Sequence, residues 1–170
     1  MSFINVEIKA RCENTQAVEQ VLKEHQAKFI GEDHQVDTYF DVEKGRLKLR
    51  TGNIENALIY YQRPNQAGPK KSDISLYQAK DLSALQNVLQ EALSVKVIVD
   101  KRRRIYFIEN VKFHIDQVAG LGSFVEIEAI DYKGKLGEAK LREQVDRYLQ
   151  LLHIRPGDLL ECSYSDLLSD

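Results

Sequence analysis

Charged residues recur at every second position in several short stretches of this sequence, a spacing that places side chains on one face of a strand. A basic set contains Arg46, Lys48 and Arg50, and an acidic set contains Glu126 and Glu128. The same spacing relates Glu7 to Lys9, Lys101 to Arg103, and His114 to Asp116. Arg and Lys neutralise phosphate oxygens, while carboxylates hold Mg²⁺ or Mn²⁺, so the two sets together indicate metal-assisted chemistry on a phosphate ester or anhydride.

Other functions would use only one of these two sets of charged residues, the basic or the acidic. Nucleic-acid binding does not require Glu126 and Glu128, and glycoside hydrolysis would use two carboxylates without needing the basic residues. A zinc site is not expected, because Cys12 and Cys162 form no CxxC or Cys/His cluster with ligand spacing, and we interpret them as reduced thiols. For the same reason His114 is predicted to be a wall residue of the sheet and not a ligand.

The composition narrows the class of protein. The chain has 170 residues, 24 Lys plus Arg, 26 Asp plus Glu and a formal net charge of -2. Such a balance predicts one soluble domain over residues 1–170 that coats neither nucleic acid nor an acidic membrane. Glu7 interrupts any signal-peptide core, and the apolar runs fall short of the roughly 20 residues that a membrane span needs, so we expect a cytoplasmic protein without a membrane partner.

Alternation of apolar and polar residues predicts about eight strands, mostly antiparallel and joined by hairpins at Gly, Asn and Asp residues. The stretches with this period are residues 6–10, 46–50, 57–63, 75–80, 95–101, 104–108, 111–118 and 124–130. Residues 64–71 contain two of the three prolines and are predicted to be a mobile loop, with Lys70 and Lys71 at its solvated tip.

Helical spacing of apolar residues predicts amphipathic helices over residues 14–25, 82–93 and 135–152, and a short helix or a strap over 163–168. The order of one strand, one helix and three strands occurs in residues 3–63 and again in 74–130, which indicates an internal duplication. Two arrangements fit these elements. In one, a half-covered sheet has a solvated charged face with cross-strand ion pairs; in the other, the sheet curls so that the charges line a closed interior.

Several segments in order resemble the CYTH superfamily, whose members include class IV adenylate cyclases and thiamine triphosphatases. Asn5-Val6-Glu7-Ile8-Lys9 resembles its ExExK signature, and Tyr164-Ser165-Asp166-Leu167-Leu168 resembles the end of the class IV cyclase branch. The other matching segments are residues 35–40, 46–50, 61–64, 101–103, 114–116 and 120–128. The resemblance implies an α+β fold, an eight-stranded antiparallel β-barrel that forms a tunnel, with flanking helices, and it favours the closed arrangement.

The resemblance also implies roles for individual residues. Tyr39, paired with Lys9, would have a catalytic role in activating the nucleophile. The metal carboxylates would be Glu7, Glu126 and Glu128, with Asp116 as a fourth acid. The residues that clamp the triphosphate would be Lys9, Arg46, Lys48, Arg50, Arg63, Lys101 and Arg103. Asn5 departs from the signature, because its neutral oxygen binds a hard cation more weakly than a carboxylate does.

The leading functional prediction is an enzyme that uses Mg²⁺ or Mn²⁺ to convert ATP to cyclic AMP and pyrophosphate. The first alternative is a triphosphatase acting on thiamine triphosphate, tripolyphosphate or a nucleoside triphosphate. The second, suggested by Asn5, is a noncatalytic module that binds a polyphosphate or a nucleotide. A homodimer is expected from the resemblance alone.

Overall fold

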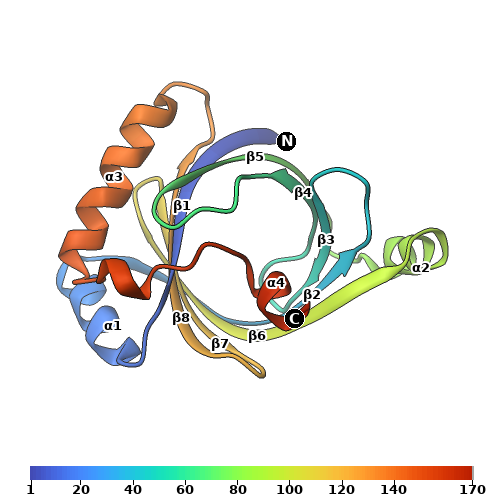
Figure 1. The fold of residues 1–170 in the computed structure, drawn as a ribbon, viewed down its shortest axis with the longest axis horizontal. Coiled ribbons are helices and arrows are strands. Elements are labelled where there is room, and N and C mark those ends of the chain that lie inside the picture. Colours follow the sequence, from blue (N-terminus) through green and yellow to red (C-terminus); the bar gives the residue numbers. More distant parts are fainter. Residues whose placement is uncertain (170) are drawn as a thin grey trace.

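The computed structural model describes residues 1–169, which form a closed antiparallel barrel with strand order β1-β5-β4-β3-β2-β6-β7-β8 (Figure 1). The strands are β1 (Ser2–Arg11), β2 (Lys28–Phe40), β3 (Arg46–Thr51), β4 (Ala57–Gln62), β5 (Lys70–Gln78), β6 (Val95–Ile108), β7 (Val111–Val118) and β8 (Gly122–Asp131). The helices are α1 (Thr15–Glu24), α2 (Ser83–Ala92), α3 (Gly137–Leu151) and α4 (Tyr164–Ser169), with a short 3-10 turn over Pro156–Asp158. Pairing of β1 with β8 closes the sheet, so the predicted α+β barrel is confirmed.

Two of the predicted strand assignments were wrong, although the number of strands was right. Residues 95–101 and 104–108 belong to one continuous strand, β6, in which the charged run around Arg103 alternates between the interior and the outside. Strand β2 was missed. Its inward residues include the buried polar side chains Asp33, Gln35 and Asp37, so polar residues occupy both faces and hide the alternation.

The prediction of a solvated tip at Lys70 was also wrong. Lys70 begins β5 and is 1% exposed. Its ammonium donates to the backbone oxygens of Gln66 at 3.2 Å and of Glu161 at 2.9 Å. The adjacent Lys71 points outward and pairs with Asp73. The side chain of Lys70 therefore fastens the C-terminal segment to the barrel.

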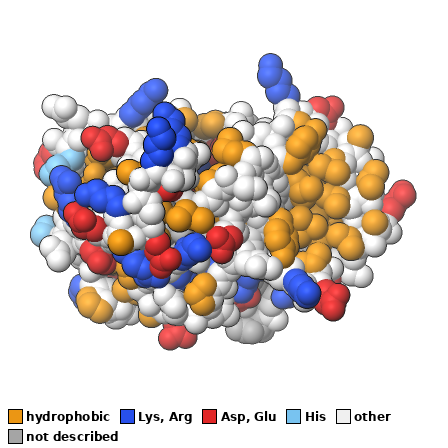
Figure 2. All heavy atoms as spheres, turned by 90° about the horizontal axis from the view of Figure 1, so that it is seen from above, with side chains coloured by type: hydrophobic (Ala, Val, Ile, Leu, Met, Phe, Trp, Pro, Cys, Tyr) orange, Lys and Arg blue, Asp and Glu red, His pale blue; other side chains and the backbone are white. Residues whose placement is uncertain are grey.

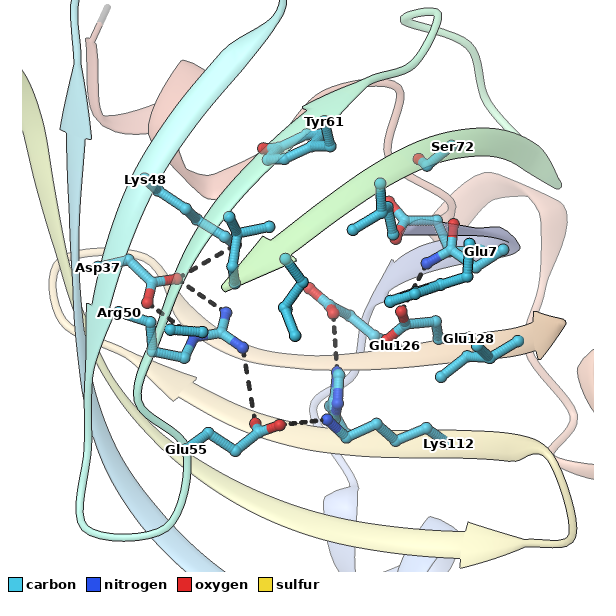
Figure 3. Close-up of a pocket in the computed structure, with 18 of the residues that line it drawn as sticks. Glu7, Asp37, Lys48, Arg50, Glu55, Tyr61, Ser72, Lys112, Glu126 and Glu128 are labelled. Carbon is cyan, nitrogen blue, oxygen red and sulfur yellow. Dashed lines mark hydrogen bonds and ion pairs between the residues drawn. The ribbon is translucent and has the colours of Figure 1, made fainter. Parts of the chain in front are cut away.

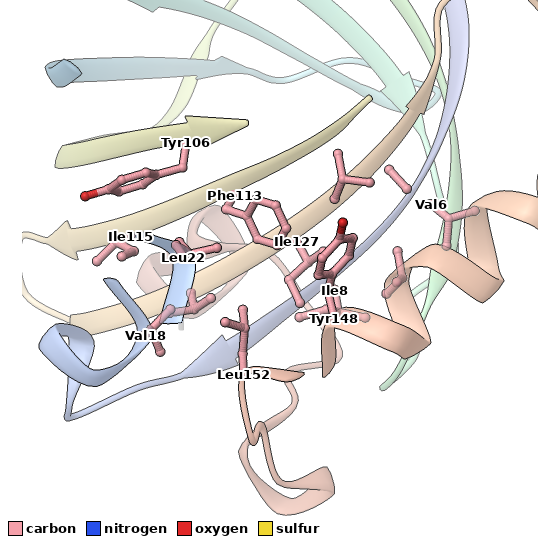
Figure 4. Close-up of a cluster of buried hydrophobic side chains, with 14 of the residues drawn as sticks. Val6, Ile8, Val18, Leu22, Tyr106, Phe113, Ile115, Ile127, Tyr148 and Leu152 are labelled. Carbon is pink, nitrogen blue, oxygen red and sulfur yellow. The ribbon is translucent and has the colours of Figure 1, made fainter. Parts of the chain in front are cut away.

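The largest of the hydrophobic clusters lies outside the barrel, between its wall and two helices (Figure 4). The outward residues of β1, β7 and β8 pack against Val18 and Leu22 of α1 and against Val145 of α3. An edge-to-face contact between Phe113 and Tyr148, with ring centroids 4.9 Å apart, joins β7 to α3. Each of these buried side chains contributes on the order of 1.5–3 kcal/mol to folding. A second cluster, which includes Ala57, Ile59, Tyr61 and Tyr164, packs on the inward face of the barrel.

The strand order agrees with the predicted duplication, because exchanging β1–β4 with β5–β8 preserves every neighbouring pair in the barrel. The two halves are covered differently. Helix α1 buries Val18 and Leu22, whereas no residue of α2 is fully buried. Val88 of α2 and Ile98 of β6 are exposed, and Figure 2 shows hydrophobic side chains gathered at the end of the molecule that carries α2. Within residues 1–169, no helix has both the length and the hydropathy to cross a membrane.

Candidate active site

The barrel encloses a cavity of about 250 Å³, and the charged strand faces predicted from the sequence line it (Figure 3). Alternation along β1 shows why. Val6 and Ile8 point outward into the core, while Asn5, Glu7 and Lys9 point into the cavity. The closed arrangement is therefore the correct one. The predicted site residues that line the cavity are Glu7, Lys9, Tyr39, Lys48, Arg50, Arg63, Lys101, Arg103, Glu126 and Glu128.

The basic wall of the cavity is organised around Asp37, to which the sequence assigned no role. Arg50 donates to its two oxygens at 2.8 and 2.9 Å, Lys101 donates at 2.7 Å, and the ammonium of Lys48 lies 3.3 Å away. Burial alone would raise the pKa of Asp37, but these cations hold it well below its usual range. Asp37 therefore remains ionised and keeps the cationic groups gathered at one place on the wall.

The acidic residue Glu126 lies across the cavity among cationic and hydrogen-bonding partners. Its oxygens contact the ammonium of Lys9 at 3.2 Å, Nη2 of Arg103 at 3.2 Å and Nδ1 of His114 at 2.9 Å. Burial opposes ionisation, but Lys9 and Arg103 keep the pKa of Glu126 well below its usual range. Burial lowers the pKa of Lys9, so a larger fraction of its amine is neutral, and available to accept a proton, than in a solvated lysine at the same pH.

A second group of carboxylates forms where β1 and β8 pair. Glu7 is opposite Glu128 in the register, and Glu7 forms an ion pair with Arg63. Asn5 donates from Nδ2 to Glu128 at 2.5 Å, while its buried Oδ1 has no hydrogen-bond partner. The hydroxyl of Ser72, opposite Asn5 on β5, is also buried and without a partner. Polar oxygens at this place are thus available for a ligand.

These residues fit Mg²⁺ or Mn²⁺ in chemistry, because such cations take carboxylate and amide oxygens. The oxygens of Glu7, Glu126 and Glu128, with Oδ1 of Asn5, supply that donor set. In the structure the carboxylates face Arg63, Lys9 and Asn5, and residues 1–169 hold no ready group of three His, Cys, Asp or Glu side chains that could bind a metal ion. Metal binding at these oxygens would therefore require the side chains to turn away from their present partners.

The predicted residues Asp116 and Arg46 do not line the cavity. The oxygens of Asp116 accept two hydrogen bonds from Arg103, both at 2.7 Å, and one from the hydroxyl of Tyr164 at 2.7 Å. Arg46 donates to Ser163 at 2.7 Å and lies 2.8 Å from Asp166. The geometry therefore presents Asp116 as the partner that orients Arg103, and Arg46 as a contact of the C-terminal segment.

Tyr39 and Lys9 both line the cavity, but each has a different partner. Lys48 donates to the hydroxyl of Tyr39 at 3.4 Å, whereas Lys9 lies 3.8 Å from the ring centroid of Tyr164. Burial raises the pKa of Tyr39, so its phenol remains protonated at neutral pH. Lys9 is consequently better suited than Tyr39 to receive a proton.

Glu55 and Lys112 also line the cavity and were missed by sequence reasoning. They form an ion pair at 2.5 Å, and Glu55 accepts a hydrogen bond from Gln35 at 2.8 Å. Glu55 lies in a hairpin loop, where no alternation marks the direction of a side chain, but Lys112 stands two residues before His114 and could have been found by the same spacing. His114 is a wall residue, as predicted, and its Nε2 is buried and unpaired.

Comparison with known proteins identifies the family. The sequence model of the CYTH domain family matches residues 4–158 of this chain. A protein of Methanocaldococcus jannaschii named "Putative adenylate cyclase MJ0240" is 27% identical, and the alignment covers 97% of this chain and 98% of that protein.

Solved structures share the fold at lower identity. The PH1012 protein of Pyrococcus horikoshii has a TM-score of 0.82 at 22% identity, covering 96% of this chain and 98% of that one. A protein of Vibrio parahaemolyticus, described as a putative adenylate cyclase, has a TM-score of 0.80 at 22% identity, covering 98% of both chains. A Hippeastrum protein, described as having a dominant triphosphatase activity, has a TM-score of 0.61 at 12% identity, covering 98% and 93%. With the family match over most of its length, this chain belongs to the CYTH domain family.

Proposed function

We propose that this protein is a metal-dependent enzyme that converts ATP to cyclic AMP and pyrophosphate. The observation that carries the proposal is the closed cavity, in which a basic wall held by Asp37 faces the carboxylates Glu7, Glu126 and Glu128. Burying so many charges is costly unless they are paired or meet a charged ligand. The phosphates of a triphosphate would pair with the basic wall, and its cation would bind the carboxylates. The M. jannaschii relative, named as a putative adenylate cyclase, supports the choice of reaction.

In the cyclase reaction the 3′-hydroxyl of ATP attacks the α-phosphorus, and the bond to the pyrophosphate oxygen breaks. Lys48, Arg50, Lys101 and Arg103 would bind the phosphates, and their anchoring to Asp37 and Asp116 would keep them in place. The amine of Lys9, whose pKa burial lowers, would take the proton of the attacking hydroxyl. A cation held by Glu7, Glu126, Glu128 and Asn5 would supply charge neutralisation on the phosphate oxygens.

A triphosphatase is the second candidate, favoured by the activity described for the Hippeastrum protein of the same fold. In that reaction water attacks the terminal phosphorus of thiamine triphosphate, tripolyphosphate or a nucleotide, and the same walls would bind the chain of phosphates. A noncatalytic module is the third. Two observations support a noncatalytic module: Asn5 stands where the family signature has an acid, and the cavity carboxylates are paired with cationic or amide side chains.

One assay separates the three candidates. Purified protein is incubated with ATP, thiamine triphosphate or tripolyphosphate and with Mg²⁺ or Mn²⁺, and the products are resolved by chromatography. Cyclic AMP with pyrophosphate supports the cyclase, whereas orthophosphate without cyclic AMP contradicts it and supports the triphosphatase. Binding without turnover in either metal supports the module. Glu126→Gln tests whether the activity belongs to this cavity, and Glu143→Gln on the exposed face of α3 is the matched control.

The homodimer and the cytoplasmic location stay predictions. Sedimentation velocity of the purified chain measures the first, with a two-chain mass expected. Fractionation of cells that express the natural protein measures the second.

A further inference from the structure

We propose that His114 is a positioning residue for the cation: its imidazole holds one carboxylate oxygen of Glu126, so that the other oxygen is presented to the metal ion. The inference rests on the proposed function and deepens it, because it assigns a role at the metal site to a residue that is not itself a ligand. Glu126 points into the cavity from β8, where the proposed function needs a carboxylate for Mg²⁺ or Mn²⁺ (Figure 3).

The two oxygens of Glu126 have different partners. Oε2 lies 2.9 Å from Nδ1 of His114 and 3.2 Å from Nη2 of Arg103, whereas Oε1 lies 3.2 Å from the ammonium of Lys9. The partners of Oε2 are themselves fixed in the wall. Arg103 donates two hydrogen bonds to Asp116, both at 2.7 Å, and His114 is 2% exposed. Oε2 is therefore the oxygen that the wall of the barrel holds in place.

The partner of Oε1 can leave more easily. Lys9 has a flexible side chain, and its ammonium also lies 3.8 Å from the ring centroid of Tyr164, a cation–π contact that would remain after Oε1 is given up. A cation at Oε1 would displace one lysine, whereas a cation at Oε2 would have to displace an imidazole and a guanidinium. At Glu126, the rearrangement that metal binding requires is thus confined to Oε1.

Contact with a carboxylate also determines which nitrogen of His114 carries the proton. An ionised carboxylate only accepts hydrogen bonds, so Nδ1 donates to Glu126. Nε2 is buried and has no hydrogen-bond partner within residues 1–169. A buried polar atom without a partner costs about 1–3 kcal/mol, and an apolar side chain at this position would avoid that cost. The fold itself therefore does not require an imidazole here, and its contribution is the bond to Glu126.

The register of the barrel keeps the imidazole beside Glu126. Glu126 lies opposite Lys9 on β1 and opposite His114 on β7, so the three side chains form a row across neighbouring strands. On the other side of His114 in this row is Ile105 of β6, which is 1% exposed. The side chain of Ile105 offers no hydrogen bond, so a turn of the imidazole toward it would lose the bond to Glu126 without replacing it.

The test compares variants that keep or remove the donor at Nδ1. Asparagine carries its side-chain nitrogen on Cγ, as histidine carries Nδ1, so His114→Asn can keep the hydrogen bond, whereas His114→Leu cannot. Binding of Mn²⁺ alone is measured from the EPR signal of the free ion. His114→Leu is expected to weaken binding on the order of 10-fold, and His114→Asn is expected to stay within about threefold of wild type. A purely structural role predicts the reverse order, because leucine preserves apolar packing better than asparagine does.

The matched control is His34→Leu. His34 also pairs with a carboxylate, that of Asp100 at 2.8 Å, but about half of each side chain is exposed on the outside of the barrel. This variant removes the same kind of contact away from the cavity, so its affinity for Mn²⁺ should equal that of wild type. A loss as large as that of His114→Leu would overturn the inference.

Two spectra of the wild-type protein test the same role without a substitution. In ¹⁵N NMR of the metal-free protein, Nδ1 of His114 should carry a proton. In pulsed EPR of the protein with bound Mn²⁺, no nitrogen should be coordinated directly to the ion. A bare Nδ1 would overturn the inference, and so would a directly coordinated nitrogen, which would make His114 a ligand. These spectra decide the matter if His114→Leu does not fold.

Failure of this inference is distinguishable from failure of the proposed function. If wild type and His114→Leu bind Mn²⁺ equally well, His114 does not position Glu126, while the metal site of the proposed function stands. If wild type binds no Mn²⁺, the metal-dependent function is wrong and the role of His114 falls with it.

Discussion

Arg50 holds Asp37 through two parallel hydrogen bonds, from Nε at 2.8 Å and from Nη2 at 2.9 Å, across neighbouring strands β3 and β2. The same carboxylate also accepts from Lys101, so a single anion on β2 gathers cations from the two strands beside it, β3 and β6. A bidentate Arg–carboxylate pair fixes the plane of the guanidinium, which leaves its remaining N–H groups directed at the cavity. The basic wall is therefore pre-formed before any phosphate arrives.

Asp37→Asn should destabilise the apo protein, because it leaves buried cations without their anion. Breaking a buried pair costs about 3–5 kcal/mol in the free energy of unfolding. Urea denaturation measures this loss, with Asp73→Asn as the control, since Asp73 is exposed and pairs with Lys71 on the same strand. Tripolyphosphate should raise the melting temperature of Asp37→Asn more than that of wild type, because it replaces the missing anion. Equal stability of Asp37→Asn and wild type would contradict the role of Asp37.

Glu126→Gln should lower metal-dependent turnover on the order of 100-fold while the protein remains folded. The carboxylate is expected to bind the cation, and it is also the partner of Lys9 at 3.2 Å. Steady-state rates in Mg²⁺ and Mn²⁺ measure the effect, and circular dichroism checks the fold. Unfolding of the variant would show that Glu126 has a structural role and that the metal site is misplaced.

The affinity for triphosphate should fall as the pH rises above neutrality. Burial lowers the pKa of Lys101 to about 7 from its ordinary value of 10.5, although Asp37 opposes the shift. Lys101 is cationic below pH 7 and loses that charge, and its attraction for phosphate, as the pH rises through the folded pKa. Lys101→Arg, whose guanidinium stays charged, should flatten the profile. Equilibrium binding of tripolyphosphate between pH 6 and 9 measures both proteins, and parallel profiles would refute the prediction.

The same shift has a consequence for stability. The unfolded chain binds more protons than the folded chain between about pH 7 and 10.5, because the pKa of Lys101 is lower in the folded state. The free energy of unfolding should therefore rise with pH across this window as far as Lys101 contributes. In Lys101→Met this contribution is absent, so its stability should rise less steeply than that of wild type. Urea denaturation at several pH values gives the two slopes, and an unchanged slope would contradict the assignment.

Tyr164→Phe should loosen the C-terminal tail, residues 159–169, without unfolding the barrel. The change removes the hydrogen bond to Asp116 and leaves a buried carboxylate with one partner fewer, a loss of about 1–3 kcal/mol. Hydrogen exchange measures it, and amides of residues 160–168 should exchange faster while those of β7 and β8 do not change. Tyr77→Phe is the control, because Tyr77 is exposed on the outer face of β5. Unchanged exchange in the tail would show that other contacts, such as Arg46 with Asp166, hold it alone.

Local patterns in the sequence were sufficient where a side chain's direction follows from strand period alone. Residues two apart face the same side, so the grouping of Arg46, Lys48 and Arg50, and of Glu126 and Glu128, follows from the chain itself. The helices over α1, α2 and α3 follow from their apolar stripes in the same way. The resemblance supplied the closed barrel, which period alone left open beside a half-covered sheet.

Only the tertiary structure decided which groups meet across strands distant in sequence. Asp37 gathers Arg50 and Lys101 because β2 lies between β3 and β6 in the barrel, a neighbourhood set by strand order and not by spacing. Glu55 enters the cavity from a hairpin loop, and Lys70 joins the tail instead of a solvated tip. Which ion pairs form depends on closure of the sheet, because a buried charge is stable only beside an opposite charge. The distances between charged groups on different strands are set only in the folded chain.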